Sequence, residues 1–332
     1  MVSSQPMPVS LHHGTDAATT RTDRDSQVGL SLPGWVSAYV DPSLPGEVVQ
    51  GDAFSVRVAR TERYALASAC VAGAATLPPL ELQRRTIDAY RGIANALRES
   101  ATPHPIRFWN FVPAIREPAG DGLDRYMVFN AGRFAAYLDW YGDPNGFDAR
   151  VPTATGIGHD APDLAIHVLA AARPGVHIMN PRQRQPRCYS PCYGPFPPCF
   201  ARATLIPDRG AGGMRVLVGG TAAVCGEQSV HPNDLHRQAD ETFENLANVV
   251  QAAWTGTRGP RGHAASDATD ALGCFRSLRV YFVCEADKPR LVQIVRGRFP
   301  HLHDIEFLRA DICRPELLVE IEGTAVVEGE LR

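Results

Sequence analysis

The chain has 332 residues, of which 44% are hydrophobic and 21% charged, and its formal net charge is −3. This composition is typical of an ordinary soluble globular protein, and the length allows two domains that each have a core. The charge gives no basic field for a nucleic acid, and no apolar run approaches the roughly 18 residues that cross a bilayer. We therefore expect neither a nucleic-acid partner nor a membrane partner.

The N-terminal 28 residues are rich in Ser, Thr, Asp and Gln and lack the apolar segment of a secretory signal. We expect residues 1–28 to be a disordered tail and the protein to be cytoplasmic. The eight cysteines include no Cys-x-x-Cys motif, so they indicate reduced thiols and no zinc site.

The first half alternates strand-like and helix-like segments. In chain order the pattern predicts strands at Phe54–Val58 and Tyr64–Val71, a helix at Leu82–Glu99, a strand at Phe108–Val112, a helix at Asp124–Trp140 and a strand at Leu164–Ala171.

The second half follows the same order after a linker near Arg173–Tyr193 that is rich in Pro, Arg, Gln and Cys. The predicted elements are strands at Phe200–Ile206 and Met214–Val218, a helix at Asp234–Trp254, a strand at Leu278–Val283, a helix at Pro289–Gly297, and strands at Asp304–Ile312 and Leu317–Val327. Residues 255–270 are expected to form a surface loop.

Two of the predicted helices match without a gap, which indicates a duplicated unit. The matched pairs are Leu82 with Leu235, Tyr90 with Phe243, Ile93 with Leu246, Ala94 with Ala247, and Asn95 with Asn248. We expect an α+β fold of two tandem β-β-α-β-α-β-β domains, with the helices packed on one face of each mixed sheet. The predicted domains are residues 29–172, with a degenerate pocket, and residues 173–332, with the active site.

Three segments carry chemical hints. Asn180–Thr204 is dense in Arg and aromatic residues and can line a pocket for an anion, because Arg forks a carboxylate; the alternative is a linker with solvated arginines. Gly219–Gly226 consists of small residues at a strand end, which allow either close ligand approach to the backbone or tight packing.

The third segment is the last strand, in which Glu320 and Glu322 alternate with Val319 and Ile321. Both glutamates therefore share one face, which is either a half-exposed face or the wall of a pocket. In a pocket, desolvation would raise the pKa of a carboxyl and suit it to donating a proton. Aligning the two halves puts His167 opposite Glu320, as expected if only one half keeps a working pocket.

Seven motifs together resemble the chorismatase family, whose chains are tandems of RidA/YjgF-like domains. These motifs are RFWNFVPAI at 107–115, FNAGR at 129–133, ATGIGH at 154–159, NPRQ at 180–183, YGPFPPCFARAT at 193–204, VGGTAAVCGEQSVHPND at 218–234 and CRPELLVEIEG at 313–323.

The resemblance implies chorismate as the substrate and pyruvate as one product, and it implies no metal and no organic cofactor. It implies Glu320 as the acid that protonates the enol carbon of chorismate. Tyr193, Arg202 and Arg309 would hold carboxylate or hydroxyl groups, and the backbone at Thr221 and Ala222 would line the ring.

The resemblance also bears on the second product, because the family contains branches that form hydroxybenzoates and a branch that forms a dihydroxycyclohexadienoate. Small residues and a cysteine near the ring accompany the 3-hydroxybenzoate branch, and Gly226 and Cys313 occupy those positions in the alignment. We therefore expect 3-hydroxybenzoate, with or without 4-hydroxybenzoate. Relatives often carry His after that glycine, where this chain has Glu227.

Two other functions remain open from the residues alone. An imine or enamine deaminase of the RidA type needs the same proton on carbon and an anchored carboxylate. A regulator that binds a ligand without turnover would lack the acid, and Glu320 argues against it. Either a monomer or a homotrimer is compatible with the duplicated chain.

Overall fold

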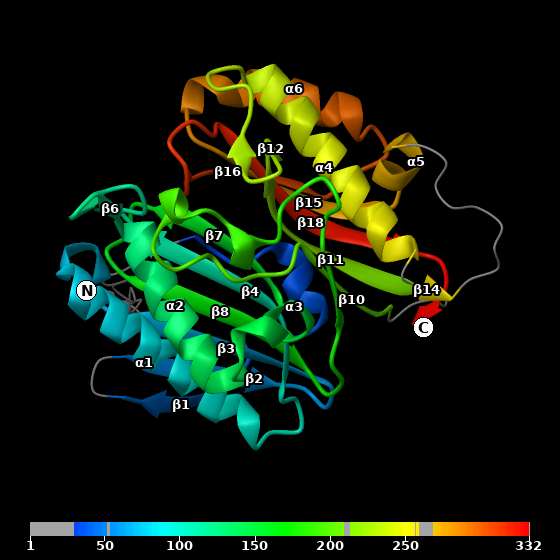
Figure 1. Cartoon of the computed structure of the whole chain (residues 1–332). Coiled ribbons are helices and arrows are strands. Elements are labelled where there is room, and N and C mark those ends of the chain that lie inside the picture. The colour runs from blue at the N-terminus through cyan, green and yellow to red at the C-terminus, as the bar shows by residue number, and fades with distance from the viewer. Residues whose placement is uncertain (1–29, 52–53, 209–212, 256, 259–267, 332) are drawn as a thin grey trace, which may run out of the picture.

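The structure is a computed structural model (Figure 1), which describes residues 30–331 except 52–53, 209–212, 256 and 259–267. The predicted tail at 1–28 and most of the predicted loop at 255–270 lie outside the described residues. None of the described helices combines the length and the apolar character needed to cross a membrane.

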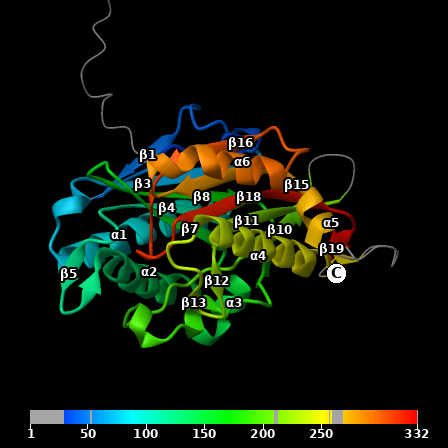
Figure 2. The same cartoon turned by 90° about the horizontal axis from the view of Figure 1, so that it is seen from above.

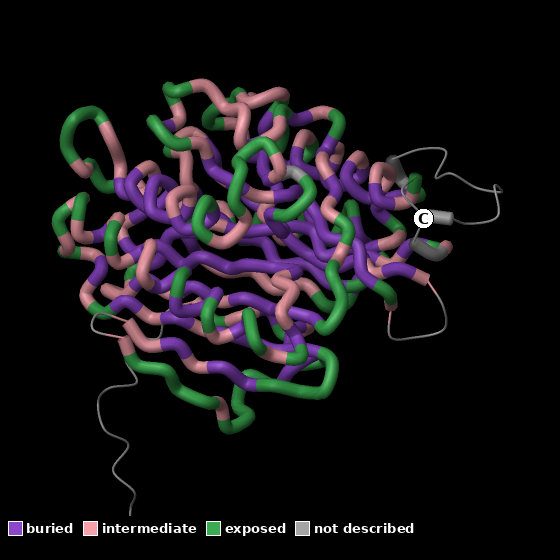
Figure 3. The backbone as a smooth tube through the Cα atoms, turned by 60° about the horizontal axis from the view of Figure 1, so that its bottom comes forward, coloured by how far each residue is buried: buried purple, intermediate pink, exposed green. Residues whose placement is uncertain are grey.

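Two mixed β-sheets form the centre of the molecule, and their central strands are largely buried (Figure 3), whereas the edge strand Glu47–Gln50 is exposed. The first sheet has the order β1-β2-β3-β8-β4-β7-β17. Its strands are β1 (Glu47–Gln50), β2 (Ser55–Arg60), β3 (Tyr64–Val71), β4 (His104–Pro113), β7 (Thr153–His159), β8 (Leu164–Ala171) and β17 (Asp311–Ile312). Only β4 and β7 pair in parallel within the described part of this sheet.

The second sheet has the order β16-β15-β18-β11-β10-β9. Its strands are β9 (Val176–Ile178), β10 (Ala203–Pro207), β11 (Met214–Ala222), β15 (Phe275–Phe282), β16 (Ile305–Arg309) and β18 (Val319–Val327). Three short ribbons pair β5 (Pro118–Gly120) with β6 (Leu123–Asp124), β12 (Val224–Cys225) with β13 (Gln228–Ser229), and β14 (Thr257–Arg258) with β19 (Glu330–Leu331).

Helices cover one face of each sheet. The α-helices are α1 (Pro79–Arg98), α2 (Arg125–Tyr141), α3 (Phe147–Arg150), α4 (Leu235–Thr255), α5 (Ala268–Gly273) and α6 (Lys288–Arg298). One core lies between the first sheet and α1 and α2, and another between the second sheet and α4, α5 and α6. Seen from above, α4 and α6 lie over the second sheet (Figure 2).

The helices form where the sequence supplies both an apolar face and end signals. In α1 the face contains Leu82, Tyr90 and Ile93, and the helix starts at a proline, whose missing N–H costs nothing in the first turn. In α2 the Asp124 side chain caps the N-terminus by accepting a hydrogen bond from the backbone N–H of Met127 at 2.8 Å. Both helices therefore present a fixed face to the sheet.

A third core joins the two sheets through the faces that the helices leave free. It contains Trp109 and Ile157 from the first sheet, Leu217 and Tyr281 from the second, and Leu317 just before β18. The molecule is thus layered as helices, sheet, sheet and helices. Because both faces of each sheet are covered, polar side chains between the sheets must find partners or line a cavity.

The predicted α+β fold with two β-β-α-β-α-β-β units and helices on one face of each mixed sheet is confirmed. The sequence interpretation did not locate β7, and it merged 304–312 into one strand. In the structure the segment breaks at Ala310, and β17 pairs antiparallel with β7 of the first sheet, with Ile312 opposite Ile157. The second half thereby contributes a strand to the first sheet.

Candidate active site

A cavity of about 250 Å³ lies between the two halves of the chain. The second half provides most of its wall, including the end of β11, the start of β18 and the segment before β10. The first half provides Asp124, Tyr126, Met127 and Arg133 from α2 and its N-cap, and Ala154 and Gly156 from β7. The expectation of a pocket in residues 173–332 therefore needs one revision, because the first half closes one side of this cavity.

Glu320 on β18 is the carboxyl group that this cavity encloses. The residue is 6% exposed and lines the cavity, and its carboxyl makes no hydrogen bond to any described residue. Burial raises the pKa of Glu320 to about 8, and the neighbouring Glu322 acts in the same direction against Arg107, Arg202 and Arg314. Near neutral pH this carboxyl is therefore mostly protonated.

Gly220 makes room for that carboxyl. A Cβ atom at position 220 would lie 1.9 Å from Oε1 of Glu320, so only glycine allows the side chain to lie over the backbone of β11 there. The pairing of β11 with β18 shifts register between Val218 and Thr221, which places Gly220 in a bulge. The bulge and the missing side chain together fix where the carboxyl can lie.

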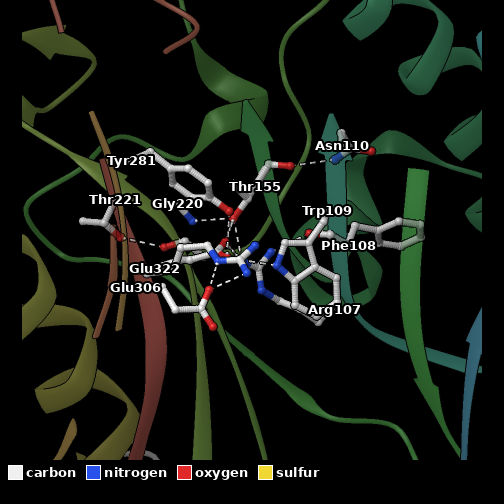
Figure 4. A network of polar contacts seen from close by, with 12 residues as sticks. Arg107, Phe108, Trp109, Asn110, Thr155, Gly220, Thr221, Tyr281, Glu306 and Glu322 are labelled. Atoms are coloured by element: carbon white, nitrogen blue, oxygen red, sulfur yellow. Dashed lines mark hydrogen bonds and ion pairs between the residues drawn. The ribbon is translucent and has the colours of Figure 1, made fainter. Parts of the chain in front are cut away.

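Glu322, two residues along the same strand, has a different environment (Figure 4). Its carboxylate accepts hydrogen bonds from Arg107 Nη2 at 2.5 Å, from Trp109 Nε1 at 3.1 Å and from the Tyr281 hydroxyl at 3.0 Å. The Thr155 hydroxyl donates to it as well. With four donors on two oxygens, Glu322 is a buried structural anion and offers no oxygen to a ligand.

The same network joins both halves to the strand that lies against Glu320. The backbone N–H of Gly220 donates to Thr155 Oγ1 at 3.0 Å, and Arg107 Nη2 also contacts that oxygen (Figure 4). Arg107 and Thr155 belong to β4 and β7, whereas Gly220 and Glu322 belong to β11 and β18. The network therefore holds the bulge of β11 against the first sheet.

Three guanidinium groups line the cavity: Arg133 on α2, Arg202 before β10 and Arg314 before β18. None of them forms an ion pair with a carboxylate of the described residues. Arg202 donates to the Tyr189 hydroxyl at 2.6 Å, and Arg133 donates to Asn130 Oδ1 at 2.7 Å. Because Arg remains charged in proteins, three cations that lack a carboxylate partner among the described residues can form a site for a small anionic ligand.

The structure brings several of the predicted site residues to this cavity. Glu320, Tyr193, Arg202, Ala222 and Cys313 line it. Burial raises the pKa of Cys313 to about 12, and the negative charge of Glu320 acts in the same direction. Cys313 is therefore a neutral thiol near neutral pH and contributes a small, polarizable wall.

Three predicted residues lie outside the lining, and in each case the reason is visible. The Thr221 hydroxyl donates to the carbonyl of Gly219 at 3.0 Å, and Gly220 takes its place in the wall. Gly226 has a φ of 60° in the turn between β12 and β13, where an added Cβ would meet nothing within 4 Å. Glycine at position 226 therefore allows a left-handed turn and does not provide space beside a ligand.

Arg309 is the third predicted residue that lies outside the lining of the cavity. It ends β16 at the edge of the second sheet, where its guanidinium pairs with Asp160 at 2.9 Å and with Asp311 at 3.2 Å. This cation is already neutralised and does not line the cavity. The sequence places Arg309 near the final strand, but strand pairing carries its side chain away from Glu320.

Sequence reasoning missed Arg133, Arg314 and Tyr126 as lining residues. Two of them belong to motifs quoted for the family resemblance: Arg133 ends the motif FNAGR, and Arg314 follows Cys313 in the motif CRPELLVEIEG. His167, which aligns with Glu320 in the first half, is paired with the Ser68 hydroxyl at 2.8 Å. Among the described residues, no three His, Cys, Asp or Glu side chains are grouped as they would be around a metal ion.

Comparison with known proteins gives consistent matches. The family model described as "Chorismatase FkbO/Hyg5-like, N-terminal" matches residues 43–170. A 3-hydroxybenzoate synthase from Streptomyces hygroscopicus is 36% identical over 241 residues, which is 72% of this chain and 68% of the relative. A chorismatase from Streptomyces rapamycinicus is 35% identical over 72% of this chain and 69% of its own length.

A solved chorismatase structure is similar as well. It has a TM-score of 0.69 and 29% sequence identity, and the match covers 85% of this chain and 80% of that one.

Proposed function

The chain belongs to the chorismatase family, and on that premise we propose that it cleaves the enol ether of chorismate and releases pyruvate. The observation that carries this proposal is the carboxyl of Glu320, which is enclosed, free of hydrogen bonds to described residues and has a pKa raised to about 8. A carboxylic acid that keeps its proton near neutral pH is the group that this reaction needs.

In the proposed first step Glu320 donates its proton to the CH2 carbon of the enolpyruvyl group. The π electrons of the enol double bond form the new C–H bond, and a lone pair of the ether oxygen stabilises the positive charge on the adjacent carbon, which becomes part of an oxocarbenium ion. The Glu320 carboxylate that remains stabilises this cation at short range. In the route to 3-hydroxybenzoate, the substrate's own ring hydroxyl attacks the ring carbon that bears the ether oxygen. The bond between that carbon and the ether oxygen breaks, and this oxygen leaves as the carbonyl oxygen of pyruvate. The ring then loses one proton as it becomes aromatic, which balances the proton taken from Glu320.

The two carboxylates of chorismate match the charge of the cavity. Arg202 and Arg314 lie on the side of the second half, and Arg133 lies on α2 of the first half. We assign the carboxylates to these three guanidinium groups, since each lacks a carboxylate partner among the described residues and each can fork an anion through parallel hydrogen bonds. The Tyr193 ring lies 3.9 Å from the Arg314 guanidinium carbon and limits the positions that this cation can take.

The proposed aromatic product is 3-hydroxybenzoate. Cys313 supports it, because it lines the cavity as a neutral thiol and the resemblance associates a cysteine beside the ring with this product. This route conserves all the atoms of chorismate, since the attack on the ring comes from the substrate itself. Gly226 gives the product assignment no support, because it lies outside the lining.

Incubation of the purified protein with chorismate tests the proposed function. We expect one pyruvate for each chorismate consumed, measured with coupled lactate dehydrogenase, and turnover that persists in EDTA. We expect 3-hydroxybenzoate as the main aromatic product by chromatography and NMR. Heat-inactivated protein is the control, because chorismate decomposes slowly by itself.

Two results would count against parts of the proposal. Chorismate that decays no faster than with inactivated protein would refute the enzymatic function and leave a binding protein. Pyruvate together with a dihydroxycyclohexadienoate would keep the function but refute the product assignment, since water would then have been added.

A further inference from the structure

The segment 184–193, which we name the strap, connects β9 to β10 along the chain and forms part of the cavity wall. It contains two short 3-10 helices, Pro186–Cys188 and Pro191–Tyr193. Its residues Tyr189, Cys192 and Tyr193 line the cavity. A strap with so little regular structure depends on specific side-chain contacts to hold its position.

The hairpin of β12 and β13 supplies those contacts through Glu227. The Glu227 carboxylate accepts hydrogen bonds from Arg184 Nη1 at 3.0 Å and from the Ser190 backbone N–H at 2.9 Å. The Ser190 hydroxyl donates to its other oxygen. One carboxylate therefore ties the beginning of the strap to its middle.

Backbone hydrogen bonds next to Glu227 hold the beginning of the strap without the Glu227 side chain. The Arg184 N–H donates to the Gly226 carbonyl at 2.8 Å, and the Gly226 N–H donates to the Arg182 carbonyl at 2.9 Å. These bonds do not extend past Arg184. In the middle of the strap, where Ser190 lies between Tyr189 and Tyr193, the described contacts with the side chain of Glu227 link the strap to the hairpin.

The strap in turn holds two of the cations in the cavity. Arg202 donates to the Tyr189 hydroxyl at 2.6 Å and to the Arg184 carbonyl at 3.3 Å. The Tyr193 ring covers Arg314 at 3.9 Å.

Arg314 is also fixed from the hairpin side. It donates to the Glu227 carbonyl at 2.7 Å and to the Ser229 hydroxyl at 3.1 Å. Glu227 therefore contacts the strap with its side chain and a cavity cation with its backbone.

The contacts of Glu227 with the strap differ from an ordinary surface ion pair in their burial and charge. The Arg184 side chain is 51% exposed, so its pairing with Glu227 alone contributes little. The Glu227 side chain is only 17% exposed, and its bonds to Ser190 are charge-assisted, which makes them the stronger contacts. The bonds from Ser190 lower the pKa of Glu227, so the carboxylate is ionised near neutral pH.

We propose that Glu227 is a positioning residue that holds the strap in the cavity wall and thereby sets the placement of Arg202 and Arg314. It touches neither the ligand nor the acid, and it acts through Ser190, Tyr189 and Tyr193. Because both cations bind substrate carboxylates in the ground state and the transition state alike, loosening them raises KM more than it lowers kcat. This kinetic consequence rests on the proposed function, whereas the fixing of the strap does not.

The test compares wild type with Glu227→Gln, which keeps the size of the side chain but loses its charge and one of its acceptor oxygens. Hydrogen exchange measured by mass spectrometry on peptides that cover 184–194 reports the strap directly. We expect exchange there to accelerate about 10-fold, as for a lost hydrogen bond to a charged group, with α4 unchanged. We expect KM for chorismate to rise about 10-fold and kcat to change less than about 3-fold.

Glu62→Gln is the matched control, because Glu62 is exposed in the turn between β2 and β3, outside the cavity. It should change neither measurement. Unchanged strap exchange in Glu227→Gln would overturn the proposal, and so would faster exchange with KM unaltered. A wild-type protein that leaves chorismate intact would refute the proposed function, and the exchange comparison would still decide whether Glu227 holds the strap.

Discussion

Two glutamates on one strand differ in their number of partners. Glu322 has four hydrogen-bond donors, whereas Glu320 has none among the described residues. Alternation in the sequence correctly placed both on one face, opposite the apolar pair that packs under α4. It could not separate their roles, because three of the four partners of Glu322 come from β4 and β7, more than 100 residues away in the chain.

The raised pKa of Glu320 has a consequence for stability that needs no ligand. Its value in the folded protein is about 8 against an ordinary 4.5, so the folded state binds an extra proton between these values. The neutral carboxyl makes its full contribution to the free energy of unfolding below about pH 4.5. This contribution is lost as the pH rises through about 8.

We therefore expect the free energy of unfolding of wild type to fall, relative to that of Glu320→Gln, across this pH range. Urea unfolding at a series of pH values measures the difference between the two proteins. Parallel curves would mean that the carboxyl is not desolvated.

Gly220 provides a second test at the scale of single residues. In Gly220→Ala the new Cβ would lie 1.9 Å from Glu320 Oε1, so the carboxyl must move from its place in the cavity. We expect kcat with chorismate to fall at least about 10-fold, because misplacing a reacting group by about 1 Å is costly. Steady-state kinetics measure the effect.

Gly297→Ala on α6 is the matched control, because an added Cβ there meets nothing within 4 Å. It should leave the kinetics unchanged and stabilise the helix slightly. If Gly220→Ala behaved like Gly297→Ala, the close packing of Gly220 against Glu320 would be wrong.

At the scale of elements, β4, β7, β11 and β18 are held together by the buried pair of Arg107 and Glu322. Their side chains are 0% and 1% exposed, and the N–O distance is 2.5 Å. Such a pair contributes little to the free energy of unfolding compared with apolar packing. Removing one partner, however, leaves the other charge buried and unpaired. The arrangement of the two sheets is therefore sensitive to either residue alone.

We expect Arg107→Met to lower the free energy of unfolding by about 3–5 kcal/mol, and Arg107→Met with Glu322→Gln to recover part of the loss. Chemical denaturation of both proteins gives the coupling between the sites. Arg91→Met is the control, since the Arg91–Asp139 pair is 55% and 50% exposed and should be worth at most about 1 kcal/mol. Additive effects of the two buried changes would argue against the network.

The sequence predicts elements well where their signal is local. The amphipathic repeat located α1 and α4, and β-prone runs located β3, β8 and β18 to within a few residues. β7 was not located, since TATGIGH contains two glycines and little aliphatic bulk. The pairing of β17 with β7 depends on how the halves dock, and the sequence carries no local signal for that.

At the scale of the whole molecule, the cavity depends on both halves of the chain. The acid and two of the arginines come from the second half, whereas Arg133 and Tyr126 come from the first. The sequence interpretation found Glu320 and Arg202 because motif and strand pattern agreed there. It missed Arg133, because a helix that packs on the first sheet gives no hint that one residue reaches the other half.

Arg133→Met tests this shared site. Arg133 is 1% exposed without a carboxylate partner among the described residues, so the substitution should preserve thermal stability or raise it. We expect affinity for chorismate to fall about 10- to 100-fold, as for the loss of a hydrogen bond to a charged group. Calorimetry of binding and thermal unfolding measure the two effects.

Arg98→Met at the exposed end of α1 is the matched control and should change neither. Arg133→Met with wild-type affinity would confine the binding site to the second half. A strongly destabilised Arg133→Met would instead make Arg133 a structural residue.

The central claim, that Glu320 supplies the proton which breaks the enol ether, is tested most directly by the single-turnover rate of pyruvate release in Glu320→Gln. The amide keeps the shape of the side chain but cannot act as the acid. With chorismate binding retained, we expect the rate to fall at least about 10²–10⁴-fold relative to wild type. Pyruvate release at a rate near that of wild type, from the same bound chorismate, would contradict the account.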